Sequence, residues 1–302
     1  MNRTFATTTF AVALLGVSAC KGGAADAVKL IPDAATVIGG VDVGALYKSK
    51  MYTGMKDKVE SGEGKEVLEA AKACNLGPDA WKNVVFGMGS EPDNMAMVFT
   101  VTGIGKKENL ECISGKIKEK SEEQPWTMEE KDGKLVLTID EGKAIGYVVD
   151  DNTIAVASKP WADAVKELIG GKGKPAVDNS LKDVYGKADT KKTIWLAGNI
   201  PGDMVKGTPA EGATNATVAV DMTGGIAVSA NVGFDKAETA KAKAGEVNTQ
   251  IEGFKGMAGS MGVPQGIVDS VKVEAKDTSV ALTAKATDEE VDKLTQLAKG
   301  AM

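Results

Sequence analysis

The chain has 302 residues, an ordinary charged fraction of 26% and a formal net charge of −6. Its length allows a substantial core in one large domain or two smaller ones. An acidic chain without basic clusters argues against nucleic acid and against anionic headgroups as partners. The chain contains no His, which removes the usual general base and the commonest metal ligand, and its single Arg is Arg3.

Residues 1–19 have the layout of a signal peptide. Arg3 supplies a positive charge, and an apolar stretch then runs from Phe10 to Val17. The sequence Val17-Ser18-Ala19-Cys20 resembles the lipobox of a bacterial lipoprotein. The apolar stretch is about half of the ~20 residues that a membrane-spanning helix needs, which favours a processed signal over an anchor. An ordinary secretory signal is the alternative.

The lipobox resemblance implies that the mature protein begins at Cys20 and that acyl chains on this residue hold it to a membrane. Lys21 follows, where an Asp would be expected for inner-membrane retention. The resemblance therefore implies the outer membrane, on its periplasmic face or at the cell surface. Residues 20–30 are then a tether of at most about 35 Å at ~3.5 Å per residue, which keeps the folded body close to the bilayer.

The remaining chain contains an apparent internal duplication. Thr36–Val43 and Thr193–Ile200 both have the pattern of a strand that runs into a Gly-containing turn. Each is followed by a second alternating strand, at Met95–Gly103 and at Ile226–Gly233, and then by a predicted helix. The same order of elements occurs twice, which predicts two related units.

A predicted hairpin follows each helix, and the two copies match best there. Glu130–Thr138 aligns with Ala275–Thr283, since both place Lys-Asp at the turn and Leu-Thr five residues later. A longer stretch precedes the second hairpin, and the surplus falls in the Gly- and Met-rich segment Gly256–Gly262. This segment is either a plain connector or a mobile apolar loop at the entrance of a groove.

The predicted strands alternate apolar and polar residues. In the clearest one, Val228 and Val232 face one side while Ser229 and Asn231 face the other, which is typical of antiparallel strands with one solvated face. Met95 and Met97 are expected on the inward face of their strand, where Met fills gaps. With amphipathic helices the pattern predicts an α+β fold, in which two duplicated units of antiparallel sheet carry helices packed on one face.

Two helices of the second unit have capping-box signatures. Asp235 with Glu238, and Thr287 with Glu290, place an acceptor three residues before an acidic side chain, as at helix starts. The first of these helices has an apolar stripe at three- and four-residue spacing, formed by Ala237, Ala240, Ala244, Val247, Ile251 and Phe254.

The expected domain organisation has five parts. They are a lipoprotein signal peptide (1–19), a tether (20–30), a first α+β repeat (31–170), a linker (171–189) and a second α+β repeat (190–302). A run rich in Gly and Lys marks the start of the linker.

The three cysteines are Cys20, Cys74 and Cys112. If Cys20 carries lipid, the other two form an even pair in an oxidising compartment, where a disulfide is the default. Two buried free thiols or a half-built metal site are the alternatives. A metal site is disfavoured because the chain lacks His and has no third free Cys.

The motifs of common catalytic sites are missing from the sequence. After Cys20 there is no phosphate-binding Gly-rich loop and no Ser-x-x-Lys motif. Adjacent carboxylates occur at Glu129-Glu130, Asp150-Asp151 and Glu289-Glu290, where solvated turns and helix caps explain them better than acid/base catalysis. We therefore expect no catalytic residue, no metal site and no cofactor.

The segment Cys74-Asn75-Leu76-Gly77-Pro78-Asp79 leads into the strand Asn83–Gly87, and a second Cys follows in the next predicted helix. This arrangement resembles a class of internally duplicated outer-membrane lipoproteins of Gram-negative cell envelopes. The class brings no known activity with it. The resemblance implies pairing of Cys74 with Cys112.

Together these patterns predict a lipid-anchored envelope protein with a non-catalytic binding or scaffolding role. Its expected partners are the membrane, through Cys20, and an envelope protein or hydrophobic ligand. A periplasmic carrier of lipid or hydrophobic ligand is the second hypothesis. An enzyme that uses only Asp, Glu or Lys is the third.

Overall fold

The structure is a computed structural model. It describes residues 24–59, 65–121, 124–131, 133–208 and 210–300. The predicted signal peptide 1–19 and the predicted lipidation site Cys20 lie outside these residues.

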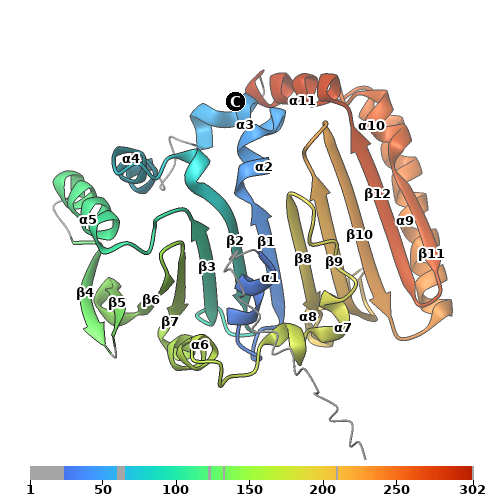
Figure 1. Cartoon of the computed structure of the whole chain (residues 1–302). Helices are drawn as coiled ribbons and strands as arrows, with labels where there is room; N and C mark the ends of the chain where they lie inside the picture. The colour runs from blue at the N-terminus through green and yellow to red at the C-terminus, as the bar shows by residue number, and fades with distance from the viewer. Residues whose placement is uncertain (1–23, 60–64, 122–123, 132, 209, 301–302) are drawn as a thin grey trace, which may run out of the picture.

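The described strands form one antiparallel sheet of 12 strands (Figure 1). They are β1 (Val37–Asp42), β2 (Trp81–Met88), β3 (Met95–Val101), β4 (Trp126–Lys131), β5 (Lys134–Ile139), β6 (Ala144–Asp150), β7 (Thr153–Ser158), β8 (Ile194–Asn199), β9 (Ala213–Asp221), β10 (Ile226–Phe234), β11 (Lys272–Lys276) and β12 (Ser279–Ala286). Their order across the sheet is β11-β12-β10-β9-β8-β1-β2-β3-β7-β6-β5-β4.

The described helices connect and cover these strands. The α-helices are α1 (Ala24–Ala27), α2 (Val43–Lys48), α3 (Lys50–Val59), α4 (Lys65–Ala73), α5 (Lys107–Ser121), α6 (Ala162–Ile169), α7 (Lys182–Tyr185), α8 (Gly202–Val205), α9 (Ala237–Ala258), α10 (Gln265–Ser270) and α11 (Asp288–Gly300). Short 3₁₀ helices are η1 (Val28–Leu30), η2 (Pro78–Ala80), η3 (Asp140–Gly142), η4 (Lys159–Trp161) and η5 (Ala176–Asp178). Within the described part of the chain, none of these helices is long and apolar enough to cross a membrane.

The sheet confirms the α+β class and shows the duplication in its strand order. The two halves meet where β1 pairs with β8, and from this junction β1-β2-β3-β7 and β8-β9-β10-β12 run outward as equivalent series. The hairpins matched by sequence are β4–β5 and β11–β12. By position, however, β12 corresponds to β7, so that β4–β5 is an additional hairpin at the edge of the first half.

Helices cover both faces of the sheet rather than one. On the face that we call the α6 face, the helices α1, α6 and α7 pack on inward residues such as Val98 and Ala157. On the opposite face, which we call the α9 face, α4 and α5 pack near Phe99 and Ile154. The register carries the same face across the sheet to β10, where α9 packs against Val232. Central strands such as β7 are apolar on both faces, so both must be covered.

Three details differ from the sequence-based expectations. Residues 24–30, predicted as part of the tether, form α1 and η1, and Ala27 and Val28 within them are buried in the core. Residues 171–189, predicted as a linker, contain η5 and α7, and Leu181 within them is 0% exposed in the core. Met95 and Met97 lie on the half-exposed α9 face, while Ala96 and Val98 point inward. Small and β-branched residues fill the tight space under α1 and α6 that longer Met side chains would overfill.

The predicted disulfide is confirmed. Cys74 follows the last turn of α4 and is bonded to Cys112 in α5, with their Cα atoms 5.9 Å apart. The bridge lies in an apolar cluster that includes Leu76 and Ile113. It therefore fixes α4 against α5 beside the central strands.

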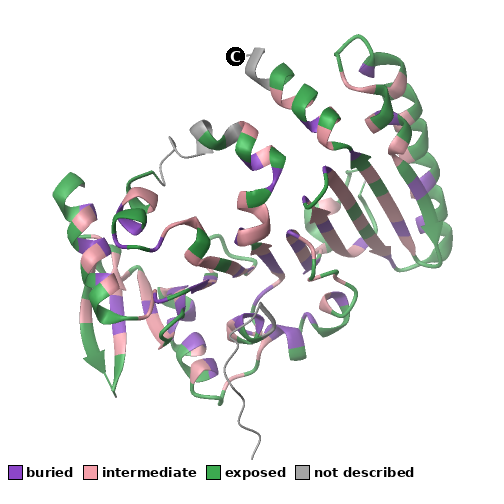
Figure 2. Cartoon of the chain, turned by 45° about the horizontal axis from the view of Figure 1, so that its top comes forward, coloured by how far each residue is buried: buried purple, intermediate pink, exposed green. Residues whose placement is uncertain are grey.

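Apolar side chains in the middle of the α9 face are only half-buried. They belong to β1, β2, β3, β8 and β9 and include Val41, Val84, Phe86, Met97, Leu196 and Val218. Figure 2 shows these central strands between the largely exposed outer surfaces of α5 and α9. The middle of this face is thus less covered than the α6 face.

Candidate functional site

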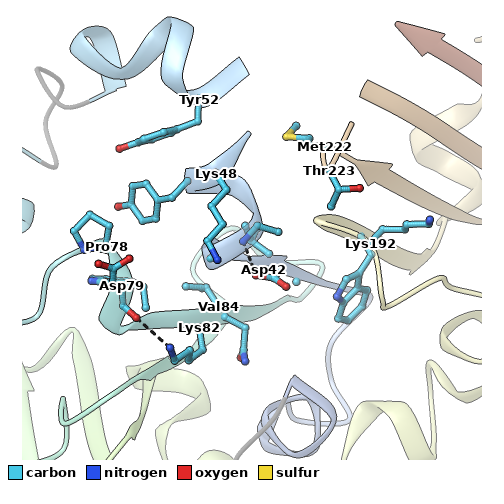
Figure 3. Close-up of a pocket in the computed structure, with 18 of the residues that line it drawn as sticks. Asp42, Lys48, Tyr52, Pro78, Asp79, Lys82, Val84, Lys192, Met222 and Thr223 are labelled. Carbon is cyan, nitrogen blue, oxygen red and sulfur yellow. Dashed lines mark hydrogen bonds between the residues drawn. The ribbon is translucent and has the colours of Figure 1, made fainter. Parts of the chain in front are cut away.

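The candidate site is a pocket at the end of the sheet where β1 leads into α2 (Figure 3). Asp42 ends β1, and its Oδ1 accepts a hydrogen bond from the backbone N–H of Ala45 at 2.8 Å, which caps α2. The capped turn directs α2 and then α3 along one side of the pocket. The rings of Tyr47 and Tyr52, one from each helix, pack edge-to-face with centroids 4.6 Å apart.

The pocket has a volume of about 1180 Å³ and contains elements of both halves of the sheet. Its apolar and aromatic wall includes Val41, Tyr47, Tyr52, Pro78, Trp81, Val84, Trp195 and Met222. Figure 3 shows Lys48 extending between Tyr52 and Val84, with Asp79 and Lys82 on one side and Lys192 on the other. Ligand pockets are usually about 300–1,000 Å³ and mostly apolar with a few polar groups, so this one has room for an organic ligand.

The charges that line the pocket are mostly positive. They are Lys48, Lys56, Lys72, Lys82, Lys191 and Lys192, against Asp42 and Asp79. Six positive and two negative charges give a net charge of +4 on a chain whose total is −6, so the remainder of the chain carries −10. This concentration of positive charge in an acidic protein attracts anions to the pocket.

Lys192 is neutralised by a neighbouring carboxylate. Its Nζ donates to Oδ2 of Asp221 at 2.9 Å, and this hydrogen bond raises the pKa of Lys192. Oδ1 of Asp221 accepts from the hydroxyl and the backbone N–H of Thr223, at 2.7 and 2.9 Å. The hydrogen bonds from Thr223, and then the one from Lys192, hold the pKa of Asp221 well below its usual range.

The other lysines of the pocket differ in how far they are engaged. Lys82 donates from Nζ to the backbone carbonyl of Asp79 at 3.0 Å. In the described part of the chain, the ammonium groups of Lys48, Lys56 and Lys191 make no hydrogen bond or ion pair. All three side chains are exposed and remain able to donate to a ligand.

The pocket has few of the groups that hydrolytic or metal-dependent chemistry uses. Among the described residues, no three His, Cys, Asp or Glu side chains lie together as a metal-binding group. The carboxylate of Asp42 is engaged as the cap of α2. The adjacent carboxylates at Glu129-Glu130, Asp150-Asp151 and Glu289-Glu290 do not line the pocket.

The site residues expected from the sequence lie elsewhere or at the margin. Cys74 and Cys112 join α4 to α5, and α4 also contributes Lys72 to the pocket lining. Met257 and Met261 are 58% and 60% exposed and do not line it. The sequence patterns did not predict this pocket. The adjacent lysines Lys191 and Lys192 are the local sequence feature that belongs to it.

No family model matches the chain, and no curated protein matches it. Its structure is similar to solved structures of TP0453. Crystal form III has a TM-score of 0.57 and 8% identity, with 90% of this chain and 97% of that chain covered. Forms I and IV have TM-scores of 0.52 and 0.51 at the same identity, covering 90% of this chain and 97% and 95% of theirs. At this identity the chain shares with TP0453 its fold.

Proposed function

We propose that the protein is a lipid-anchored, non-catalytic envelope protein whose folded body binds a ligand in the lysine-lined pocket. The observation that carries the binding role is the pocket itself, which is large, partly apolar and lined by a net charge of +4. The lipobox resemblance at Val17–Cys20 supports the anchor and the outer-membrane location.

The short distance between the predicted anchor and the folded body supports action close to the bilayer. The first described element is α1. Its last residue, Ala27, is 3% exposed because it packs in the core on the α6 face. The seven Cα-to-Cα steps from Cys20 to Ala27 span at most about 25 Å at ~3.5 Å per residue. The anchor would therefore hold the folded body close to the bilayer, where lipids and other envelope components are available as ligands.

The test is native mass spectrometry of the protein extracted from envelopes in mild detergent. Ala45 lines the pocket from α2, and Ala45→Trp adds an indole that occupies part of it. Ala242→Trp is the matched control because Ala242 is an exposed residue of α9 that does not line the pocket. Thermal unfolding establishes that both variants are folded.

We expect the wild type and Ala242→Trp to retain a co-purified ligand mass that Ala45→Trp has lost. A ligand mass retained equally in both variants would place the binding site outside the pocket. Absence of any bound mass in all three proteins, with lipids and envelope extract supplied, would contradict the binding role.

The periplasmic carrier is the second candidate function, and the half-buried apolar residues of the α9 face favour it. Val41 of β1 and Val84 of β2 line the pocket. Phe86, two residues after Val84 in β2, continues this apolar surface away from the pocket. A carrier would release the ligand to an acceptor membrane. Transfer of the co-purified ligand from the protein to empty vesicles, at a rate above spontaneous loss, distinguishes a carrier from a static binding protein.

A further inference from the structure

We propose that the pocket binds an anionic amphiphile, with a phosphate or carboxylate group held by Lys48, Lys56 and Lys191 and an apolar chain along the pocket wall. The inference rests on the proposed function, because it names the chemical class of ligand for the same pocket.

Among the described residues, none of the three lysines has a carboxylate partner for its positive charge. Of the two acidic residues in the lining, Asp42 already caps α2 with its carboxylate. Lys192 has Asp221 as its partner, while Lys48, Lys56 and Lys191 have none among the described residues. An anionic group in their midst would lower their mutual repulsion and accept hydrogen bonds from each ammonium.

The lysines reach the pocket from separate elements. Lys48 ends α2, Lys56 belongs to α3, and Lys191 precedes β8 in the second half of the sheet. The β1–β8 pairing is what brings the third lysine into the lining of the same pocket as the other two. An ammonium is a compact point charge, so such a set suits the spread oxygens of a phosphate or carboxylate without bidentate geometry.

The wall of the pocket is not that of a site for a small inorganic anion. Tyr47, Trp81 and Val84 present aromatic and aliphatic surface to a volume of about 1180 Å³. An inorganic phosphate would occupy a small part of that volume and leave this surface in water. An acyl chain attached to the anionic group would cover it, which is favourable by the hydrophobic effect.

The apolar surface also continues out of the pocket in one direction. Val41 lies between Val84 and Ile194 in the register of β1 with β2 and β8. Two residues earlier in β1, a Cβ at Gly39 would lie 2.5 Å from both Leu196 Cδ2 and Phe86 Cζ, because these side chains meet over the glycine. An extended chain can therefore leave the pocket along half-buried apolar side chains of the α9 face.

The experiment compares pairs of probes that differ in the charge of the head. Dihexanoyl-phosphatidylglycerol is compared with dihexanoyl-phosphatidylcholine, and oleate with oleyl alcohol, while inorganic phosphate is the anion without a chain. Binding of each probe to the full lipoprotein in neutral detergent is measured by titration at low and high salt.

We expect the anionic member of at least one pair to bind ten times more tightly than its uncharged or zwitterionic partner. Phosphatidylglycerol preferred over oleate indicates a phospholipid, and the reverse indicates a free fatty acid. The preference should weaken as salt rises, because the three ammonium groups are exposed. Inorganic phosphate should bind at least ten times more weakly than the preferred amphiphile.

The variant Lys48→Gln/Lys56→Gln/Lys191→Gln should lose the charge preference. The control Lys241→Gln/Lys272→Gln/Lys285→Gln changes the net charge equally at exposed positions of α9, β11 and β12, and should retain the charge preference.

Equal binding of charged and uncharged partners, or equal loss in both variants, overturns the anionic assignment and leaves the proposed binding function standing. Phosphate binding as tight as that of the amphiphiles overturns the role of the apolar wall. Failure of every probe to bind, together with no co-purified ligand, overturns the proposed function as well.

Discussion

The indole of Trp195 lies directly against Gly40 across the junction of the two halves. The two residues are paired in the register of β1 with β8, and a Cβ at Gly40 would lie 2.4 Å from Nε1 of Trp195. Trp195 is 2% exposed, and its ring also packs edge-to-face with Tyr185. Because Gly40 and Trp195 both line the pocket, the same contact joins the halves and shapes the site.

Gly40→Ala should lower the free energy of unfolding by about 2–3 kcal/mol, as expected for overpacking against a buried ring that cannot move aside. Gly245→Ala in α9 is the control, since its Cβ would meet nothing within 4 Å. Alanine there should stabilise the helix by about 0.5–1 kcal/mol. Urea unfolding of both variants measures the difference, and a Gly40→Ala protein as stable as the wild type would contradict the contact.

Removal of the disulfide should destabilise the protein without changing its fold. The bond between Cys74 and Cys112 closes a loop with a sequence separation of 38 residues. In the chain-entropy model such a loop contributes about 4 kcal/mol. We expect the Cys74→Ala/Cys112→Ala variant to lose about 2–4 kcal/mol of stability in urea unfolding. If the wild-type protein, kept oxidised and unfolded, still consumed two equivalents of a thiol reagent, Cys74 and Cys112 would not be bonded to each other.

The hydrogen bonds of Asp221 should make stability fall in acid. Thr223 and Lys192 depress the folded-state pKa of this carboxyl, so the unfolded chain binds the proton more readily at acidic pH. Their stabilisation is complete above the ordinary Asp pKa and is lost as pH falls below it. Asp221→Asn should therefore be less stable than the wild type at pH 7, and the difference should shrink toward pH 3. Chemical denaturation across this range tests it, and a constant difference would refute the linkage.

The lipobox predicts the covalent state of the mature N-terminus. Intact mass of the protein from envelopes should correspond to a chain that begins at Cys20 and carries acyl groups. Cys20→Ala should abolish the added mass and release the protein into the aqueous phase on detergent partition. An unmodified mature chain in the wild type would instead favour an ordinary secretory signal.

Local sequence signals predicted local structure well. The predicted box of Thr287 with Glu290 is present at the start of α11. The N–H of Thr287 donates to Glu290 Oε2 at 2.8 Å, and the N–H of Glu290 donates to Thr287 Oγ1 at 3.3 Å. The box of Asp235 with Glu238 does not form, because α9 begins one residue later, after Lys236, without a side-chain cap. The same signature thus fixes a helix start only where the backbone turns at the expected residue.

The apolar stripe predicted for α9 is also confirmed only in part. Ala240 and Ala244 are buried, as the spacing predicts, and Val247 and Ile251 pack on the same cluster. Phe254, the last residue of the stripe, is 44% exposed. Periodicity predicts which side of a helix is apolar, but how far along the helix that side is covered depends on where the sheet ends.

The pocket could not be predicted from the sequence because its lysines come from distant segments. Lys48 and Lys56 follow β1, while Lys191 precedes β8, and the pairing of these strands places all three in the lining of one pocket. The sequence match between the hairpins β4–β5 and β11–β12 also did not reveal which hairpin stands beside β3. Strand order in an antiparallel sheet is set by long-range packing, which residue patterns do not encode directly.

The most direct test of a ligand site in this pocket is amide hydrogen exchange with and without dihexanoyl-phosphatidylglycerol. We predict slower exchange in α2, in α3 and at residues 190–192 on addition of the lipid, with little change at the exposed end of α9 around Met257. Protection confined to the end of α9, or no protection anywhere at saturating lipid, would contradict the account.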